Sequence, residues 1–327
     1  MRTLIVLCAG TRRINNLPVF LNRHPDGKLL AEKAIEGIYP DKYDEIVYTI
    51  LQADDDRFAA ERILLNEVGR KYNVKVIKLC MPTNGPAESV YLTIKTGQIE
   101  GEFAVRDSLN NITLCNHISG NFVAGLDLIK YDDEVYNVRS KSFMVTNEQG
   151  QILDIIEKRL RSDIISVGLY GFKKAADFIF AYEKLNDINY PIKKMHVSNI
   201  ISYLIGYKQR VFHCTNVSFH EDWGTPETWN RIQRKYATVF VDTDKLLGKY
   251  YEDKWADELV NKLSLLEGTA QSIVLFTRSN AVNKKSIYDK LDKKRIKCID
   301  FVCSVSYSSE QLMVSDEHDL EKVKLGI

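Results

Sequence analysis

Two aspartates stand where a metal ion could be held. Asp107 ends an apolar run at residues 103–107, and Asp222 stands between a strand-like run at residues 209–218 and the turn Gly224-Thr-Pro226. Glycine permits a tight backbone path and proline suits the first turn of a helix, so Asp222 marks a strand–turn–helix corner. An exposed acid at an ordinary corner is the alternative. Because ligands of open α/β sheets bind at the carboxyl ends of the strands, Asp107 stands where a metal-bound nucleotide could lie, while both interpretations of Asp222 stay open at this point.

A different set of residues suits the binding of phosphate and nucleotide. A continuous apolar run at residues 3–8 leads almost directly into Gly10-Thr-Arg-Arg13. A small-residue turn after a buried strand lets backbone N–H groups approach a phosphate, and arginines supply positive charge. An ordinary basic loop is the alternative. Farther along, residues 83–89 open a helix whose free N–H groups can contact a base or ribose.

Three further acids, at residues 54–56, also look like metal ligands. They begin a helical pattern that runs to about residue 72. Acidic residues are favoured at helix caps and in the first turn, because they complement the partial positive charge of the helix start. We therefore predict that this triplet caps a helix.

The elements that must position these residues alternate along the chain. Apolar runs indicate strands at residues 3–8, 44–51 and 74–80, and helical patterns occupy residues 29–38 and 54–72. Such alternation is typical of a parallel sheet flanked by helices. From about residue 121 short alternating strands dominate, which predicts that the sheet becomes mixed.

A second α/β pattern begins near residue 237 with a strand that ends in Asp242-Thr-Asp244. We therefore predict two domains, residues 1–235 and 236–327, with almost no linker. The predicted fold class is α/β: a mixed, mostly parallel sheet flanked by helices, followed by a small Rossmann-like α/β domain.

Composition excludes several classes of partner. The chain has 327 residues, of which 45% are hydrophobic and 27% charged, and a formal net charge of +1. This balance gives no reason to expect nucleic acid as a partner, and no apolar run is long enough for membrane insertion. Six scattered cysteines without a CxxC pair indicate reduced thiols in a cytoplasmic protein. A homodimer is the default expectation for the oligomeric state.

The first ~235 residues resemble the sugar-phosphate-type nucleotidyltransferases with a glycosyltransferase-A-like fold, and more narrowly the subgroup of capsule and surface-polysaccharide pathways. The resemblance rests on the order and spacing of short motifs. These are Leu7-Cys-Ala-Gly-Thr-Arg12, Gly27-Lys28, Gly85-Pro-Ala-Glu-Ser89, Asp107 with Asn110, Asn137 with Lys141-Ser142, Glu157-Lys158, Gly168-Leu-Tyr-Gly-Phe172, Ser198 and Asp222-Trp-Gly-Thr225.

This resemblance implies a role for each matching residue. The nucleotide would contact Leu7, Ala9, Gly10, Thr11, Arg12, Gly85, Glu88 and Arg106. The acceptor would contact Lys141, Glu157, Lys158 and Gly168. Asp107 and Asp222 would bind Mg²⁺, and Arg12, Lys28 and Lys158 would be the catalytic cations. The implied substrates are a nucleoside triphosphate (NTP), with CTP slightly preferred, and a phosphorylated small molecule.

The implied chemistry is attack by an acceptor phosphate oxygen on the α-phosphorus, with pyrophosphate as the leaving group. Such a transfer depends on alignment and charge neutralisation more than on an acid or base. The chain departs from the family pattern in three places: Gly10 runs straight into Thr11, Val19 replaces a lysine, and Leu109 replaces a second acid. A protein that binds a nucleotide or sugar phosphate but transfers weakly is therefore the alternative.

The last ninety or so residues resemble a haloacid-dehalogenase (HAD)-like phosphatase without a cap domain. Asp242 and Asp244 match its nucleophile and acid–base pair, Thr277 its phosphate-binding residue and Asp316 a late acid. The lysine of that family is missing from residues 304–309. This difference favours a degenerate domain, and a working phosphatase in a bifunctional enzyme is the alternative.

Overall fold

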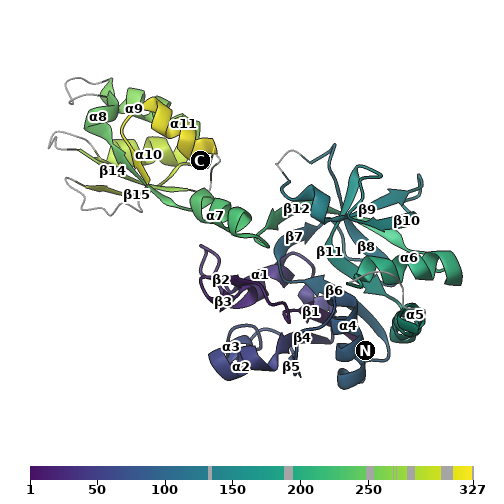
Figure 1. Cartoon of the computed structure of the whole chain (residues 1–327). Coiled ribbons are helices and arrows are strands. Elements are labelled where there is room, and N and C mark those ends of the chain that lie inside the picture. The colour runs from purple at the N-terminus through teal and green to yellow at the C-terminus, as the bar shows by residue number, and fades with distance from the viewer. Residues whose placement is uncertain are drawn as a thin grey trace. The chain divides into compact units, whose positions relative to one another are not determined.

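The computed structural model describes residues 1–131, 135–187, 194–247, 254–267, 269, 271–277, 284–302 and 312–325. The chain forms two compact units, Met1–Gly224 and Thr225–Ile327. Each unit has its own sheet and its own core, and each is described by itself (Figure 1).

A large sheet runs through the first unit, with the strand order β5-β4-β1-β6-β11-β8-β12-β7. Its strands are β1 (Arg2–Leu7), β4 (Glu45–Leu51), β5 (Val74–Leu79), β6 (Glu102–Asp107), β7 (Asn110–Leu114), β8 (Phe122–Asp127), β9 (Ser142–Thr146), β10 (Ile152–Glu157), β11 (Ile164–Phe172) and β12 (His213–Asp222). Neighbours among β5, β4, β1 and β6 run parallel, whereas β11 runs antiparallel to β6, β8 and β9. The predicted change from a parallel to a mixed sheet is thus confirmed.

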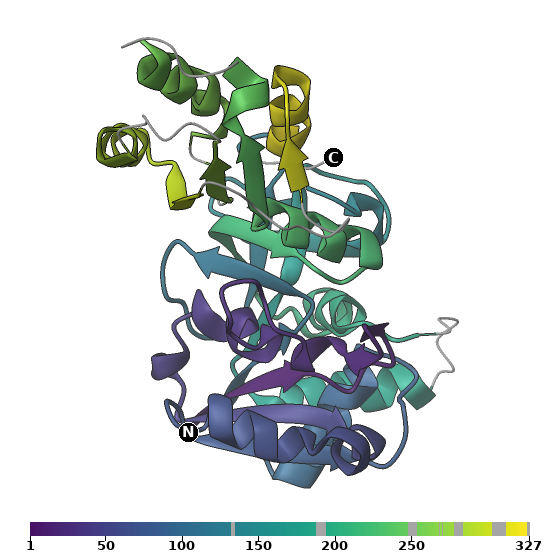
Figure 2. The ribbon, with the colours of Figure 1, turned by 90° about the vertical axis from the view of Figure 1, so that its left-hand side faces the viewer.

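Successive apolar side chains of the central strands point to opposite faces of this sheet, and helices cover both faces. In β1, Leu4 and Val6 join one apolar cluster and Ile5 joins the other, as expected for side chains that point alternately to opposite faces. The first cluster includes residues of α1 and α3, and the second includes residues of α4, α5 and α6. Figures 1 and 2 show these helices around the strands of the sheet. Because both faces are buried, these strands read as continuous apolar runs.

The helices of the first unit connect these strands. They are η1 (Val19–Leu21), α1 (Leu30–Glu36), η2 (Pro40–Lys42), α2 (Gln52–Phe58), α3 (Ala60–Glu67), α4 (Pro86–Gly97), η3 (Val138–Ser140), α5 (Ala175–Asp187) and α6 (Val197–Lys208), and the short strands β2 (Arg13–Ile14) and β3 (Leu17–Pro18) pair with each other. The single helix predicted from residue 54 to about 72 is wrong. Ala59 takes a left-handed conformation with φ of 53° and divides it into α2 and α3.

The second unit is built on four parallel strands in the order β15-β14-β13-β16. Its elements are α7 (Pro226–Lys235), β13 (Thr238–Asp242), α8 (Thr243–Leu247), α9 (Trp255–Leu263), η4 (Ser264–Leu266), β14 (Ser272–Phe276), α10 (Lys284–Lys293), β15 (Lys297–Val302), β16 (Leu312–Val314) and α11 (Glu317–Leu325). A small parallel α/β sheet is what the sequence pattern predicted here. Its relationship to HAD-type phosphatases stays a prediction.

The helix α7 groups with the second unit by its contacts, although the sequence placed it at the end of the first domain. The side-chain amide of Gln271, which precedes β14, donates to the carbonyl of Arg234 near the end of α7 at 3.5 Å. Ser272 N also donates to Ala237 O at 3.3 Å. Within the described residues, no helix is long and apolar enough to cross a membrane.

Candidate active site

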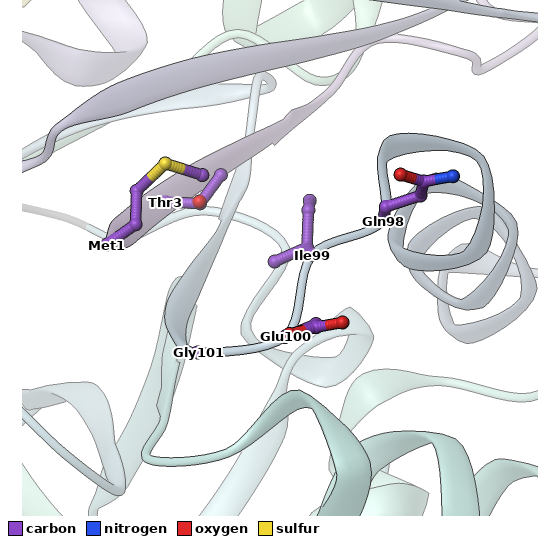
Figure 3. A pocket seen from close by; sticks show the side chains of 6 residues that line it. All are labelled: Met1, Thr3, Gln98, Ile99, Glu100 and Gly101. Carbon is purple, nitrogen blue, oxygen red and sulfur yellow. The ribbon is translucent and has the colours of Figure 1, made fainter.

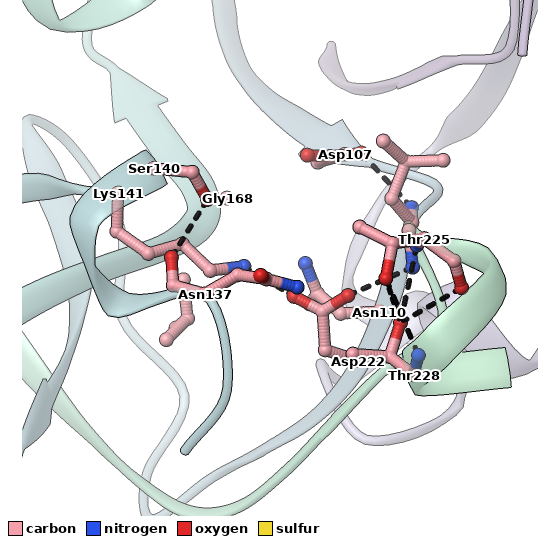
Figure 4. Close-up of polar contacts among 12 residues, drawn as sticks. Asp107, Asn110, Asn137, Ser140, Lys141, Gly168, Asp222, Thr225 and Thr228 are labelled. Atoms are coloured by element: carbon pink, nitrogen blue, oxygen red, sulfur yellow. Dashed lines mark hydrogen bonds and ion pairs between the residues drawn. The ribbon is translucent and has the colours of Figure 1, made fainter. Parts of the chain in front are cut away.

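Asp107 and Asp222, the two candidate metal ligands, each stand at the end of a strand in the first unit. Asp107 ends β6, where it pairs in register with Leu7 of β1. Asp222 ends β12, where it pairs with Asn110 of β7. Asp107 Oδ1 accepts a hydrogen bond from Leu109 N at 2.9 Å, and Asp222 Oδ1 accepts one from Gly224 N at 2.7 Å. Both carboxylates are therefore fixed by their own backbone turns (Figure 4).

A buried tryptophan joins these two turns. Trp223 is fully buried, its indole Nε1 donates to Ser108 O at 2.9 Å, and its backbone N donates to Leu109 O at 3.0 Å. The Ser108 hydroxyl donates in turn to Leu7 O at 2.6 Å. The ends of β1, β6 and β12 are thus connected through Trp223 and Ser108, which brings Asp107 and Asp222 into the same neighbourhood.

Asp222 is close enough to Asp107 to influence the ionisation of the Asp107 carboxyl. Burial raises the pKa of the Asp107 carboxyl; Arg106 and Lys141 oppose this shift, and the negative charge of Asp222 adds to it. A carboxylate pair of this kind is stabilised by a cation placed between its members.

The backbone beside Asp107 requires a glycine. Gly168 lies in β11, where the register with β8 shifts, and has a φ of +78°. A Cβ at this position would lie 2.7 Å from the Cβ of Asp107. The sequence placed Gly168 among the acceptor contacts, and the structure gives it a second reason: only glycine lets β11 pass so close to Asp107.

Arg106 has a different environment from the one that the sequence implied. Its side chain is fully buried, and its guanidinium donates to the carbonyl oxygens of Ala34, Val167, Gly168 and Asn110 and to the side-chain Oδ1 of Asn110. These five acceptors match the five N–H donors of an arginine. Arg106 therefore holds α1, β7 and β11 together and has no surface left to offer a nucleotide.

The basic loop after β1 reaches the Asp222 turn. Arg12 donates from Nη1 to Gly224 O at 2.6 Å, while Gly10, Thr11 and Arg12 are exposed. Among the described residues, and apart from its two chain neighbours, no atom lies within 4 Å of the place where a Cβ on Gly10 would stand. The loop therefore has room on its outer side for a ligand close to its backbone.

The acidic triplet supports this loop. Asp54 is buried and accepts from Arg13 Nη2 at 2.6 Å, and Arg13 also donates to the carbonyl oxygens of Gly10 and Arg12. Asp55 accepts from Glu61 N at 3.0 Å in the first turn of α3. The triplet thus performs a capping and anchoring role, although the capped helix is α3.

The segment predicted to contact the base or ribose opens α4. Glu88 reaches back to accept from Asn84 N at 2.6 Å. A Cβ on Gly85 would lie 2.5 Å from the carbonyl oxygen of Met195, which accepts from Ala87 N at 3.1 Å. This segment is therefore packed directly against the chain that leads into α6.

That chain carries a residue that the sequence did not single out, His196. Its Nδ1 lies 3.4 Å from Glu157 Oε1, and its Nε2 lies 3.4 Å from Lys158 Nζ. Ser142 and Ser198 both donate to the other oxygen, Oε2, of Glu157. The only available signal was that His196 and Asn199 flank the start of a helical pattern, which indicates a cap and says nothing of Glu157.

The remaining predicted lysines differ in their surroundings. Lys158 has a left-handed φ of 53° at the end of β10, and Lys141 Nζ donates to Asp222 Oδ2 at 2.5 Å. Lys28 forms an ion pair with Glu36 of α1. Its contacts do not connect it with the other site residues, so its catalytic role stays a prediction.

The donor set of this site fits Mg²⁺ only if substrate completes it. Within the described ranges, no group of three or more His, Cys, Asp or Glu side chains is arranged to hold a metal. Asp107 Oδ2 accepts no hydrogen bond from a described residue, and Asp222 Oδ2 is shared with Lys141. Because Mg²⁺ in nucleotide enzymes is bound by one or two carboxylates plus phosphate oxygens, these two residues are a sufficient protein contribution.

The candidate acids of the second unit each have a local partner. Asp242 ends β13, and its carboxylate accepts from Lys245 N at 3.1 Å and lies 3.8 Å from Lys245 Nζ. Thr277, after β14, donates its hydroxyl to Asp244. Asp316 precedes α11 and accepts from Asp319 N at 2.8 Å, as a helix cap does. Residues 304–309, where the family lysine was sought, lie outside the described residues.

A surface pocket lies at the opposite end of the first unit's sheet. It is lined by Met1 and Thr3, around the start of β1, and by residues 98–101 (Figure 3). The amino ends of β1 and β6 border it, whereas Asp107 stands at the carboxyl end of β6. This pocket is therefore separate from the candidate active site.

No family model and no curated protein matches the chain. Solved structures do match. A nucleoside-diphosphate-sugar pyrophosphorylase from Vibrio cholerae RC9 is 16% identical, with a TM-score of 0.59, over 72% of this chain and 100% of that one. The chain shares the fold of this structure. The inositol-1-phosphate CTP transferase from T. maritima is 13% identical, with a TM-score of 0.55, over 70% of this chain and 91% of that one.

A third match is a putative glucose-1-phosphate thymidylyltransferase from Bacillus anthracis, solved in complex with a sucrose. It is 13% identical, with a TM-score of 0.55, over 71% of this chain and 94% of that one. At these identities the likeness establishes the fold. The predicted fold of the first domain is confirmed in this respect, while none of the three structures covers the whole chain.

Proposed function

We propose that the protein is a nucleotidyltransferase that transfers a nucleoside monophosphate from an NTP to a phosphorylated sugar, polyol or similar acceptor, with release of pyrophosphate. One observation carries the proposal. The ends of β6 and β12 bring Asp107 and Asp222 together through Trp223, directly beside the basic loop that reaches Gly224 through Arg12.

Each part of the site has a task in this reaction. Backbone N–H groups of Gly10 and Thr11 and the guanidinium of Arg12 would hold the triphosphate, with Lys28 as a further cation. Gly85 and Glu88, at the start of α4, would lie against the base or ribose. Leu7 and Ala9 would border the nucleotide where β1 ends.

Asp107 and Asp222 would hold Mg²⁺, which supplies charge neutralisation for the phosphates and the departing pyrophosphate. Lys158 would orient the acceptor phosphate for in-line attack, and Glu157, fixed by Ser142 and Ser198, would contact the rest of the acceptor. A phosphate monoester is an anion near neutral pH, so the attack needs no general base. Alignment and neutralisation therefore account for the catalysis.

CTP is the first nucleotide to test. One structure that shares the fold is named as an inositol-1-phosphate CTP transferase, and the motif resemblance extends to cytidylyltransferases of surface-polysaccharide pathways. We propose on this basis that the product is a cytoplasmic precursor of a surface polysaccharide.

The direct test measures pyrophosphate release from CTP, UTP, GTP and ATP with Mg²⁺ and a panel of phosphorylated sugars and polyols. At least one pair should release pyrophosphate, and Asp222→Ala should abolish the release. If no pair exceeds background while a nucleotide still binds tightly in calorimetry, the chain is the binding protein considered as the alternative.

A second activity is supported by the second unit. The ion pair between Lys245 and Asp242 supplies positive charge beside the candidate nucleophile, although the lysine sought at residues 304–309 is missing. We propose that this unit hydrolyses a phosphate ester. A phosphatase screen of the wild type and of Asp242→Asn tests this; absence of any wild-type activity would leave the unit a structural or regulatory role.

A further inference from the structure

Lys141 contacts the metal-binding and the acceptor-binding parts of the site at once. Its ammonium donates to Asp222 Oδ2 at 2.5 Å, and its carbonyl oxygen accepts from Lys158 N at 3.1 Å. The two side chains of the ion pair are largely buried, with 15% of Lys141 and 9% of Asp222 exposed. Figure 4 shows the Lys141 and Asp222 side chains pointing toward each other.

The backbone of Lys141 is fixed, whereas its ammonium is carried on a flexible stem. Asn137 takes a left-handed φ of 57°, and the short turn η3 follows it. Lys141 N donates to Val138 O at 3.0 Å, which closes the turn. A lysine ammonium on four methylene groups can exchange partners without a change in the backbone.

Lys141 and a divalent cation would both bind the same oxygen, Oδ2 of Asp222. Asp222 Oδ1 is committed to Gly224 N, so its Oδ2 is the oxygen available to a cation. Lys141 already donates to this oxygen. A divalent cation at the two carboxylates brings positive charge next to the Lys141 ammonium, and like charges at such short range repel strongly in a partly buried site.

We propose that Lys141 and a divalent cation compete for Oδ2 of Asp222, and that the displaced ammonium then binds the phosphate of the acceptor. The binding of the acceptor phosphate by Lys141 rests on the proposed function. The bond from Lys158 N to Lys141 O places the backbones of both lysines side by side, so that two ammonium groups can serve one phosphate. Cation binding and acceptor binding then favour each other, because thermodynamic coupling is reciprocal.

The test uses the full chain, without nucleotide, and Mn²⁺ as the probe, with free Mn²⁺ measured by electron paramagnetic resonance. Lys141→Met removes the competing ammonium and should bind Mn²⁺ about tenfold more tightly than the wild type. Lys141→Gln, of similar length and neutral, should do the same if the methionine variant folds poorly. Lys33→Met is the matched control, because Lys33 is 12% exposed and also ion-paired, with Asp26 and Glu36. It should leave Mn²⁺ affinity unchanged.

Inorganic phosphate tests the second half. It should raise the Mn²⁺ affinity of the wild type, and this enhancement should be lost in Lys141→Met. Unchanged or weaker Mn²⁺ binding in both neutral Lys141 variants would overturn the competition, as would wild-type Mn²⁺ binding in Asp222→Asn.

These outcomes are independent of turnover. Tighter Mn²⁺ binding in the Lys141 variants of a chain that releases no pyrophosphate would sustain the competition and refute the proposed function. Pyrophosphate release by the wild type, together with no gain in Mn²⁺ affinity in the Lys141 variants, would support the proposed function and refute the competition.

Discussion

The two units both place acids at the carboxyl end of a strand, but they assemble them differently. In the second unit Asp242, Asp244 and Lys245 follow one another in the chain, and the ion pair joins residues three apart. In the first unit Asp107 and Asp222 come from distant segments, and the cation beside Asp222 comes from a third segment at Lys141. A local cluster can be recognised in a sequence, whereas a cluster built from distant segments depends on the core that joins them.

Dependence on the core makes the first site rigid but vulnerable. Trp223 and Arg106 bind no substrate in the proposed reaction, yet each holds an element that carries a site residue, and Gly168 lets β11 pass close to Asp107. The second unit's acids are held by hydrogen bonds within α8 and to Thr277. Substitutions in the core should therefore affect the two sites unequally.

The largest expected effect separates the two units. Asp222→Ala removes a proposed Mg²⁺ ligand and should lower pyrophosphate release by about 100-fold or more. Asp242→Asn should leave this release unchanged, since its acid belongs to the other sheet. Initial rates at saturating NTP and Mg²⁺ provide the comparison. A similar loss in both variants would contradict the assignment of the transfer to the first unit alone.

Gly168 tests how closely the first site is packed. Gly168→Ala puts a residue at a φ of +78° with its Cβ 2.7 Å from that of Asp107. We expect a loss of about 1–3 kcal/mol in the free energy of unfolding, and slower transfer because Asp107 must move. Gly206→Ala is the control, because that glycine lies in α6 with no atom within 4 Å of the added Cβ. Pyrophosphate release by the control should stay near the wild type, and its unfolding should show no loss of stability, because alanine is favoured over glycine within a helix.

Comparing substitutions at Trp223 and Trp229 separates the contribution of a buried indole hydrogen bond to stability from the contribution of burial alone. Trp223→Phe loses the donor to Ser108 O and leaves this buried acceptor unpaired, which should cost about 1–3 kcal/mol. Trp229 is also buried, and its Nε1 has no hydrogen-bond partner among the described residues. Trp229→Phe should therefore cost less. Equal losses in chemical denaturation would show that the indole hydrogen bond does not hold the β12 end in place.

The smallest effect concerns His196. Burial lowers the pKa of this histidine, with Lys158 and Lys194 contributing, while Glu157 opposes the shift. An unfolded histidine takes up a proton near pH 6.5, so below this pH the unfolded chain binds more protons and stability falls. His196→Asn should reduce this fall between pH 7 and pH 5, measured by urea unfolding. The same substitution at exposed His213 is the control; an identical pH dependence in His196→Asn and the wild type would contradict the argument.

The sequence predicted those features that depend on local pattern. The apolar run before Gly10, the positions of Asp107 and Asp222 at strand ends, and the change to a mixed sheet follow from periodicity and turn residues. Trp223 belongs to the motif at Asp222, but its bond to Ser108 O depends on how β6 and β12 meet. The fold was predictable to this extent.

Contacts that the tertiary structure alone creates were not predictable. Ala59 breaks a helix whose pattern is continuous, and its left-handed conformation leaves α2 packed against β4 and β5 and α3 against β5. Arg106 looks like a ligand residue at a strand end, and only the folded chain supplies carbonyl oxygens for all its donors. Lys141 and His196 find their partners across long stretches of sequence, so no spacing rule could pair them.

The central claim is that Asp107 and Asp222 act as one cation site in nucleotidyl transfer. A double-mutant cycle with Asp107→Asn, Asp222→Asn and the combined variant tests it through Mg²⁺-dependent pyrophosphate release. If the two carboxylates act as a unit, each single substitution should cost about as much as both together. Losses that multiply in the double variant would show that the two aspartates act independently and would contradict the account.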